Sequence, residues 1–257
     1  MRTVTATRYV TPLREGGSLP AVIEADDDGM YVMKFRGAGQ GAKALVAEVI
    51  AGELARLLGL PIPEIVLVEL DPDMARTEPD PEIQDLIRAS GGTNVALDYL
   101  PGAINFDPLV EQPDALLASS IVWFDALVAN VDRTARNTNL LLWHRRLHLI
   151  DHGAALYFHH DWASADNAAA SPFARIADHV LLPLATRLRE ADAALAARIG
   201  DDDIERIVAQ VPDAWLAGEP VFADVAAHRR AYVDHFRARL RQRDAFVEEA
   251  IRAHGHL

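Results

Sequence analysis

The stretch VANVDRTARNTNLLLWHRRLHLIDHG spans residues 128–153 and decides the fold. It places three oxygen-bearing side chains, those of Asp132, Asn137 and Asp151, on one loop and the hairpin that follows it. Apolar residues recur at helical spacing before this loop, and the pattern ends near Asn130. After the loop, two short apolar runs flank a polar break, which predicts a hairpin. Oxygen ligands placed in this way can hold a hard cation and a phosphate together.

The composition is typical of a globular protein whose core needs no covalent cross-links. A chain of 257 residues is long enough for one large domain or two smaller lobes. The absence of cysteine excludes disulfides and thiolate metal sites. No apolar run reaches membrane-spanning length and the first residues lack a signal-peptide core, so we expect no membrane span and a cytoplasmic location.

The charge balance narrows the choice of partners. A formal net charge of −13 argues against non-specific binding to nucleic acid or to an anionic membrane. Lys34 and Lys43 are the only lysines among 25 basic residues, and the others are arginines. A lysine kept in such a chain can serve as a compact charge against a phosphate, or it can be there by chance.

The first 36 residues alternate as three strands do. The first break contains Gly16, Gly17 and Ser18, which either let backbone N–H groups approach an anion or form a plain hairpin turn. Lys34 lies in the third strand among apolar residues. It is either a lysine on a solvated face or a functional group, and the second reading needs a carboxylate nearby.

A glycine-rich segment at 37–41 precedes an amphipathic helix that ends at Gly59. Lys43 falls in the first turn of this helix, where an anion could bind. Glu48 is a candidate partner for Lys34, and Glu53 is its rival. Each glutamate could equally be a solvated helix residue.

Downstream of this helix the pattern changes from mostly β to mostly α. Strands are predicted at 62–70 and 94–100, and a loop with a short helix lies between them. Pro101 and Gly102 form the most plausible boundary. Helical spacing then dominates, with a capped helix starting at the acidic residues 201–203. The pattern predicts an α+β protein.

The pieces in chain order are a glycine turn, a strand lysine, a helix glutamate, and the loop and hairpin of residues 130–153. This order resembles the HipA-like kinases and the related phosphatidylinositol-kinase branch, whose loop reads N-x-D-R-x-x-x-N, here Asn130 to Asn137. The resemblance implies a bilobed protein-kinase-like fold. Its β-rich N-lobe would cover residues 1–100, and its mostly helical C-lobe residues 101–257.

The resemblance also implies a role for each matching residue, with ATP and Mg²⁺ as cofactors. Asp132 would be the catalytic base that takes the proton of an acceptor hydroxyl, on a protein or a small molecule. Asn137 and Asp151 would bind Mg²⁺. Lys34 would meet the α/β-phosphates, held in place by Glu48. The other nucleotide-binding positions would be the phosphate-covering turn of Gly16, Gly17 and Ser18 and the hinge of Asp98, Tyr99 and Leu100.

The loop departs from the usual family pattern at two positions. Thr134 and Arg136 stand where a histidine and a lysine are usual. The chain is also too short for the extra N-terminal domain of full-length HipA toxins, so a toxin's substrate should not be carried over. Arg133 is expected to tie the loop to a nearby carboxylate or carbonyl.

Two other functions stay open at this stage. An ATP-binding pseudokinase or regulatory module would have the same fold without turnover. A metal-dependent phosphohydrolase is the other alternative, because imidazoles and carboxylates crowd one region and could bind Zn²⁺ or Mn²⁺. The residues concerned are His148, Asp151, His152, His159, His160 and Asp161.

Overall fold

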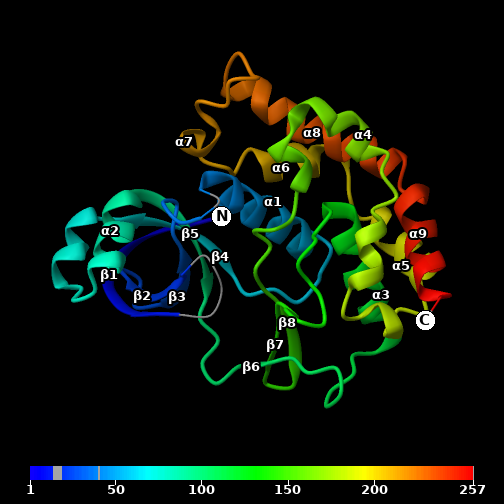
Figure 1. Ribbon diagram of the computed structural model, residues 1–257, viewed down its shortest axis with the longest axis horizontal. Helices are drawn as coiled ribbons and strands as arrows, with labels where there is room; N and C mark the ends of the chain where they lie inside the picture. The colour runs from blue at the N-terminus through cyan, green and yellow to red at the C-terminus, as the bar shows by residue number, and fades with distance from the viewer. Residues whose placement is uncertain (14–18, 40, 257) are drawn as a thin grey trace.

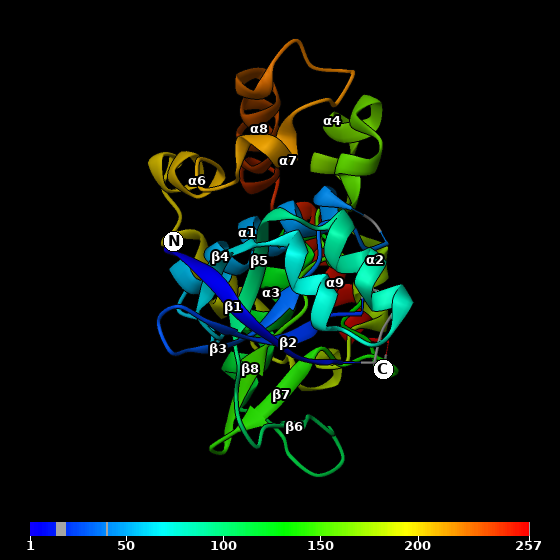
Figure 2. The ribbon, with the colours of Figure 1, turned by 90° about the vertical axis from the view of Figure 1, so that its left-hand side faces the viewer.

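The structure, a computed structural model, describes residues 1–13, 19–39 and 41–256. The protein has two lobes, a β-rich one and a mostly helical one (Figure 1). Figure 2 shows the hairpin of β7 (Leu140–Trp143) and β8 (Arg146–Leu149) on one side of the β-rich lobe. Helices α6 (Asp201–Val208), α7 (Asp213–Leu216) and α8 (Val225–Arg241) lie on the opposite side. The predicted α+β bilobed fold is therefore confirmed.

The β-rich lobe is a closed barrel of five strands in the order β1-β2-β3-β5-β4. Parallel pairing of β1 with β4 closes the barrel, and all its other strand pairs are antiparallel. Along β1, Val4 and Ala6 are buried and their neighbours are exposed, as a strand with one face on a core requires. The strands are β1 (Thr3–Pro12), β2 (Ala21–Ala25), β3 (Met30–Lys34), β4 (Ile65–Leu70) and β5 (Gly92–Asp98).

Two short helical segments cover one side of the barrel where the sequence predicts a loop with a short helix. They are η1 (Pro72–Thr77) and α2 (Pro81–Ala89). Asp71 and Asp80 cap them, and each helix has a proline in its first turn, where its missing N–H costs nothing.

Helix α1 (Ala42–Leu57) packs against β4 and β5 on one side and against α6 and α7 on the other. Every residue from 45 to 55 is buried, so the helix is enclosed on all sides and is not amphipathic as its sequence suggested. Small residues allow this enclosure. A Cβ on Gly52 would lie 2.2 Å from the Cδ1 of Ile65, so only glycine fits there. Most of the buried side chains of α1 belong to the core of the helical lobe.

The helical lobe is built on α3 (Ala115–Val128), whose first turn is capped by Asp114. A small sheet follows, with β6 (Ile104–Asn105), β7 (Leu140–Trp143) and β8 (Arg146–Leu149). The predicted hairpin is confirmed, and its two turn residues, His144 and Arg145, have left-handed backbones that match the twist of the strands. The boundary proposed at Pro101 and Gly102 stays a prediction.

The remaining helical segments complete this lobe. Among the described residues, no helix has both the length and the apolar character needed to cross a membrane. The segments are η2 (Tyr157–His160), η3 (Trp162–Ser164), α4 (Ala165–Ala169), η4 (Ala174–Asp178), η5 (Leu182–Leu184), α5 (Leu188–Ala196), α6 (Asp201–Val208), α7 (Asp213–Leu216), α8 (Val225–Arg241) and α9 (Asp244–His254).

Candidate active site

A cleft of about 880 Å³ lies between the barrel and the β7–β8 hairpin. Both lobes and the segment that joins them contribute to its walls, and it is large enough for a mononucleotide-sized ligand. Its lining includes Val32, Lys34, Leu97, Asp98, Tyr99 and Leu100 from the barrel side and Arg136, Asn137, Leu140, Ile150 and Asp151 from the other side.

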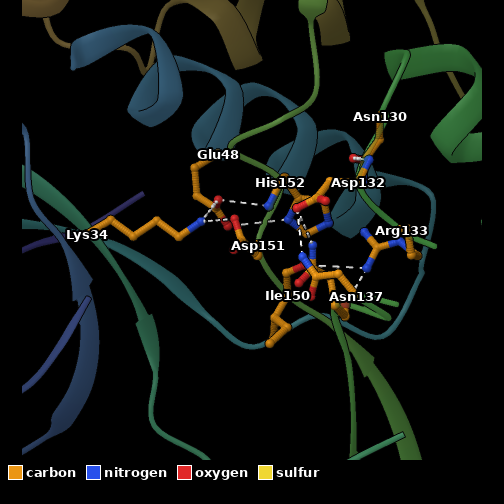
Figure 3. Close-up of polar contacts among 10 residues, drawn as sticks. Lys34, Glu48, Asn130, Asp132, Arg133, Asn137, Ile150, Asp151 and His152 are labelled. Carbon is orange, nitrogen blue, oxygen red and sulfur yellow. Dashed lines mark hydrogen bonds and ion pairs between the residues drawn. The ribbon is translucent and has the colours of Figure 1, made fainter. Parts of the chain in front are cut away.

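Three charged side chains from distant parts of the chain meet at one end of this cleft (Figure 3). The Nζ of Lys34 lies 2.5 Å from Oε2 of Glu48 and 2.5 Å from Oδ1 of Asp151. The backbone N–H of His152 donates to the same Oε2 at 2.8 Å. Strand β3, helix α1 and the residues after β8 are thus joined by one polar ring.

The electrostatics of this ring keep Lys34 and Glu48 ionised. Burial favours the neutral form of Lys34, but the carboxylates of Glu48 and Asp151 outweigh it and hold the pKa of the ammonium above its ordinary value. Burial likewise opposes ionisation of Glu48, but Lys34 and His152 lower the pKa of this carboxyl to about 2. At neutral pH Lys34 is therefore an ammonium and Glu48 a carboxylate.

The fold explains why Glu48, and not Glu53, is the partner of Lys34. Glu53 is bonded to Arg56 in the next turn of α1 and to Gln210 of the helical lobe, on the side away from Lys34. Asp151 has a backbone φ of 54°, an uncommon conformation for a residue other than glycine. It turns the chain at the end of the hairpin, so that the carboxylate faces the cleft.

The loop after α3 gathers the other predicted residues. Oδ2 of Asp132 accepts hydrogen bonds from Nδ2 of Asn137 at 2.8 Å and from Nδ2 of Asn139 at 3.2 Å. The N–H of Thr134 donates to the carbonyl of Asn137 at 2.9 Å and closes the loop. Asp132 and Asn137 are thus in direct contact.

Arg133 has the structural role that its sequence predicted. It is buried, and its Nε donates to Oδ2 of Asp125 at 2.6 Å. Its Nη1 donates to the carbonyls of Asn139 and Ile150. The expectation that Arg133 ties the loop to a carboxylate or carbonyl is confirmed.

Several residues of the site escaped sequence reasoning. Asn139 and Asp125 lie within or near the opening stretch, but no spacing rule singles them out. His152 was considered only as a metal ligand of the phosphohydrolase alternative, and not as a partner of Glu48. His179 lies far downstream, and no sequence signal connects it with the loop. Its Nε2 contacts Oδ2 of Asp125 at 2.9 Å.

The predicted glycine turn and the second lysine have different outcomes. Gly16, Gly17 and Ser18 lie outside the described residues. Lys43 does not present a free cation at the start of α1, because its Nζ donates to the carbonyl of His159 at 2.7 Å and pairs with Glu219 at 3.0 Å. Lys43 links α1 to the helical lobe.

The histidines after the hairpin are dispersed over different contacts. His159 shares a hydrogen bond with the hydroxyl of Tyr232, while His152 contacts Glu48. Burial, together with the neighbouring cations, lowers the pKa of His159 to about 2, which keeps it neutral. Among residues 1–13, 19–39 and 41–256, no three histidine or acidic side chains are grouped so as to hold a metal.

Solved structures of kinases share the fold of this chain. The proinflammatory kinase CtkA of Helicobacter pylori is similar over 98% of this chain and 97% of its own, with 13% identity and a TM-score of 0.57. The Golgi casein kinase with Mn/ADP bound is similar over 97% of this chain and 73% of its own, with 11% identity and a TM-score of 0.51. These likenesses define the class of the fold, that of bilobed protein-kinase-like proteins.

The sequence narrows this class to one family. Residues 7–249 match the HipA-like kinases, and the chain belongs to that family. The resemblance inferred from Asn130 to Asn137 is thereby confirmed, and the protein is a kinase-type phosphotransferase. A comparison with curated proteins found no match.

Proposed function

We propose that the protein transfers the γ-phosphate of ATP to a hydroxyl group of a protein or small-molecule acceptor. The observation that carries the proposal is the polar ring of Lys34, Glu48 and Asp151 at one end of the cleft. In phosphoryl transfer a protein acts mainly by positioning groups and neutralising charge. A buried lysine held between carboxylates beside an open cleft suits that task.

The cleft offers a place for the base of the nucleotide. Val32 and Leu97 line it from the barrel, and Leu140 and Ile150 line it from the opposite lobe, so a flat ring could be sandwiched between apolar side chains. The hinge formed by Asp98, Tyr99 and Leu100 would run along the edge of this ring. The N–H groups of Asp98 and Tyr99 already bond within the barrel, which favours the carbonyls and Leu100 as partners of the base.

Asn137 and Asp151 would hold Mg²⁺, because amide and carboxylate oxygens are the ligands that this cation prefers. A related fold, the Golgi casein kinase, has been solved with Mn/ADP. Mg²⁺, when bound, would neutralise the charge of the phosphates. Asp151 would then exchange its contact with Lys34 for the metal, which frees the ammonium to meet the α/β-phosphates.

Asp132 would orient the acceptor hydroxyl and take its proton as general base. Its carboxylate is held by Asn137 and Asn139, so it is placed next to a proposed metal ligand. The acidic net charge of −13 favours a protein or small-molecule acceptor over one in an anionic membrane.

Thermal denaturation and phosphate transfer test the proposal together. Mg-ATP at about 100 times its Kd should stabilise the fold by about 2.7 kcal/mol, and labelled γ-phosphate should reach an acceptor hydroxyl. Asp132→Asn should keep the thermal shift and lower turnover by about two to four orders of magnitude. Asp178→Asn, at an exposed carboxylate outside the cleft, is the matched control and should keep turnover.

The alternatives give different results. A thermal shift without transfer in any acceptor screen would support the pseudokinase or regulatory module. Hydrolysis of phosphate esters without nucleotide, with stoichiometric Zn²⁺, would support the phosphohydrolase. No shift with any nucleotide would exclude both the kinase and the pseudokinase.

A further inference from the structure

A buried cluster of polar side chains lies beneath the loop that carries Asp132. Its centre is Asp125, in the last turn of α3, which is fully buried. Burial opposes ionisation of this carboxyl, but Arg133 and His179 outweigh it and hold its pKa well below the usual range. An ionised carboxylate in such a place must be matched on every side by donors.

One carboxylate oxygen of Asp125 is connected to the proposed base, Asp132, through hydrogen bonds of Asn130. Oδ1 accepts a hydrogen bond from Nδ2 of Asn130 at 2.9 Å, and Oδ1 of Asn130 accepts one from the N–H of Asp132 at 3.1 Å. The backbone carbonyl of Asp125 also accepts from the N–H of Asn130 at 2.9 Å. Ala129, with φ at 51°, ends the helix between them. Two hydrogen bonds thus connect Asp125 with the backbone of Asp132.

The other carboxylate oxygen is connected through Arg133 to the end of the hairpin, where the proposed metal ligand Asp151 lies. Oδ2 accepts from Nε of Arg133 at 2.6 Å, and the same guanidinium reaches the carbonyls of Asn139 and Ile150. Asn139 bonds to the carboxylate of Asp132, and Ile150 directly precedes Asp151. The position of Arg133 therefore affects both sides of the proposed reaction centre.

His179 supplies the remaining donor from another part of the chain. The N–H of Leu181 donates to its Nδ1 at 3.0 Å, so the ring proton is on Nε2, which faces Oδ2 of Asp125 at 2.9 Å. The N–H of Val180 donates to the carbonyl of Arg133 at 3.1 Å. The segment after η4 is thus bonded both to Asp125 of α3 and to the loop.

We propose that Asp125 is the positioning residue of the reaction, and that it sets the geometry of the loop and of the hairpin end through Asn130 and Arg133. His179 completes this set of contacts by donating to the same carboxylate. The inference rests on the proposed phosphotransfer. The side-chain partners of Asp125 are Asn130 and Arg133 of the loop and His179 of the segment bonded to it, so the donors that stabilise this carboxylate also fix the loop.

Asp125→Asn is the sharpest perturbation, because it keeps the size of the side chain. The new amide group would face Asn130 on one side, or Arg133 and His179 on the other, so at least one donor would meet another donor. A displacement of about 1 Å in catalytic groups costs about 10²-fold in rate, so kcat should fall by about that factor. KM for the nucleotide should change by less than about threefold, since Lys34 and the barrel side of the cleft are not altered.

The matched control is Glu53→Gln, which neutralises another buried carboxylate with an arginine partner, far from the loop. It should lower the melting temperature but leave kcat unchanged when both are assayed well below their melting temperatures. His179→Gln keeps an N–H donor and should retain most of the turnover. His179→Leu removes the donor and should reproduce the loss of Asp125→Asn.

Hydrogen exchange of the amides in residues 130–139 separates the inference from the proposed function. In Asp125→Asn these amides should exchange at least about tenfold faster than in Glu53→Gln. If the wild-type protein transfers no phosphate, the proposed function fails, while the exchange rates still decide whether Asp125 holds the loop. Unchanged loop exchange, or unchanged kcat in an active protein, would overturn the inference.

Discussion

The pair of Lys34 and Glu48 makes an asymmetric prediction about stability. Lys34→Met would leave the fully buried carboxylate of Glu48 with the backbone N–H and the ring Nδ1 of His152 as its remaining partners. Glu48→Gln would leave the ammonium of Lys34 paired with Asp151, whose side chain is 41% exposed. The first change strands a buried charge and the second does not. Lys34→Met should therefore be the more destabilising of the two.

The magnitudes follow from burial. Removing one partner of a buried ion pair costs about 3–5 kcal/mol, which we expect for Lys34→Met. Glu48→Gln should cost about 1–3 kcal/mol, the price of a weakened hydrogen bond to a charged group. The double variant should be more stable than the sum of the single changes predicts, by at least about 1 kcal/mol, because neither charge is then left alone.

The difference in stability between the wild type and Lys34→Met should depend on pH with a definite sign. In the wild-type protein the pKa of Glu48 is lowered to about 2, so its contribution to stability is present above 4.5 and is lost as the pH falls through 2. Without Lys34, burial raises the pKa of Glu48 above its ordinary value, and protonation then relieves the buried charge. The stability gap between wild type and Lys34→Met should narrow when the pH is lowered from 8 towards 5.

Urea denaturation of the wild type, both single variants and the double variant at two pH values measures all of these quantities. A coupling free energy below about 0.5 kcal/mol would refute the reasoning, since that is the range of independent sites. A larger loss for Glu48→Gln than for Lys34→Met would refute the asymmetry.

Two further predictions concern other parts of the molecule. Burial is the main cause that lowers the pKa of His159 to about 2 and that of His235 to about 3. Below pH 6.5 the unfolded chain therefore binds protons that the folded chain does not, and each histidine should cost about 1.4 kcal/mol of stability per pH unit. Urea denaturation between pH 6.5 and 5 should show this slope in the free energy of unfolding. In His235→Gln the slope should be smaller by about 1.4 kcal/mol per pH unit, and above pH 7 the two proteins should have equal slopes. An undiminished slope in His235→Gln would contradict the assignment. Val32→Trp would place an indole in the cleft, so it should weaken nucleotide binding by about tenfold or more in calorimetry while the protein stays folded; unchanged affinity would place the nucleotide elsewhere.

The fold and the residues of the loop were largely predictable because their signals are local. The helix before Asp132, the loop and the hairpin each depend on residues a few positions apart. The first half of β1 has the period-two burial of a half-buried strand. The enclosure of α1 was not predictable, because an apolar stripe does not reveal whether a second layer covers the other face of the helix.

The partners of the two lysines show where local reasoning ends. Glu48 and Glu53 lie five residues apart on α1, roughly 140° around its axis, so only one can face Lys34. Which one does so depends on how the helix is rotated against the barrel. For Lys43 the sequence allowed a bound anion at the helix start, but its partners are the carbonyl of His159 and the carboxylate of Glu219.

The sequence by itself determined that Asp132, Asn137 and Asp151 lie on one loop and hairpin, because their spacing sets their local geometry. Only the tertiary structure decided that Glu48 holds Lys34 and that His179 bonds to Asp125. These contacts join residues far apart in the chain. The packing of whole helices and strands brings them together, and no short-range pattern records that packing.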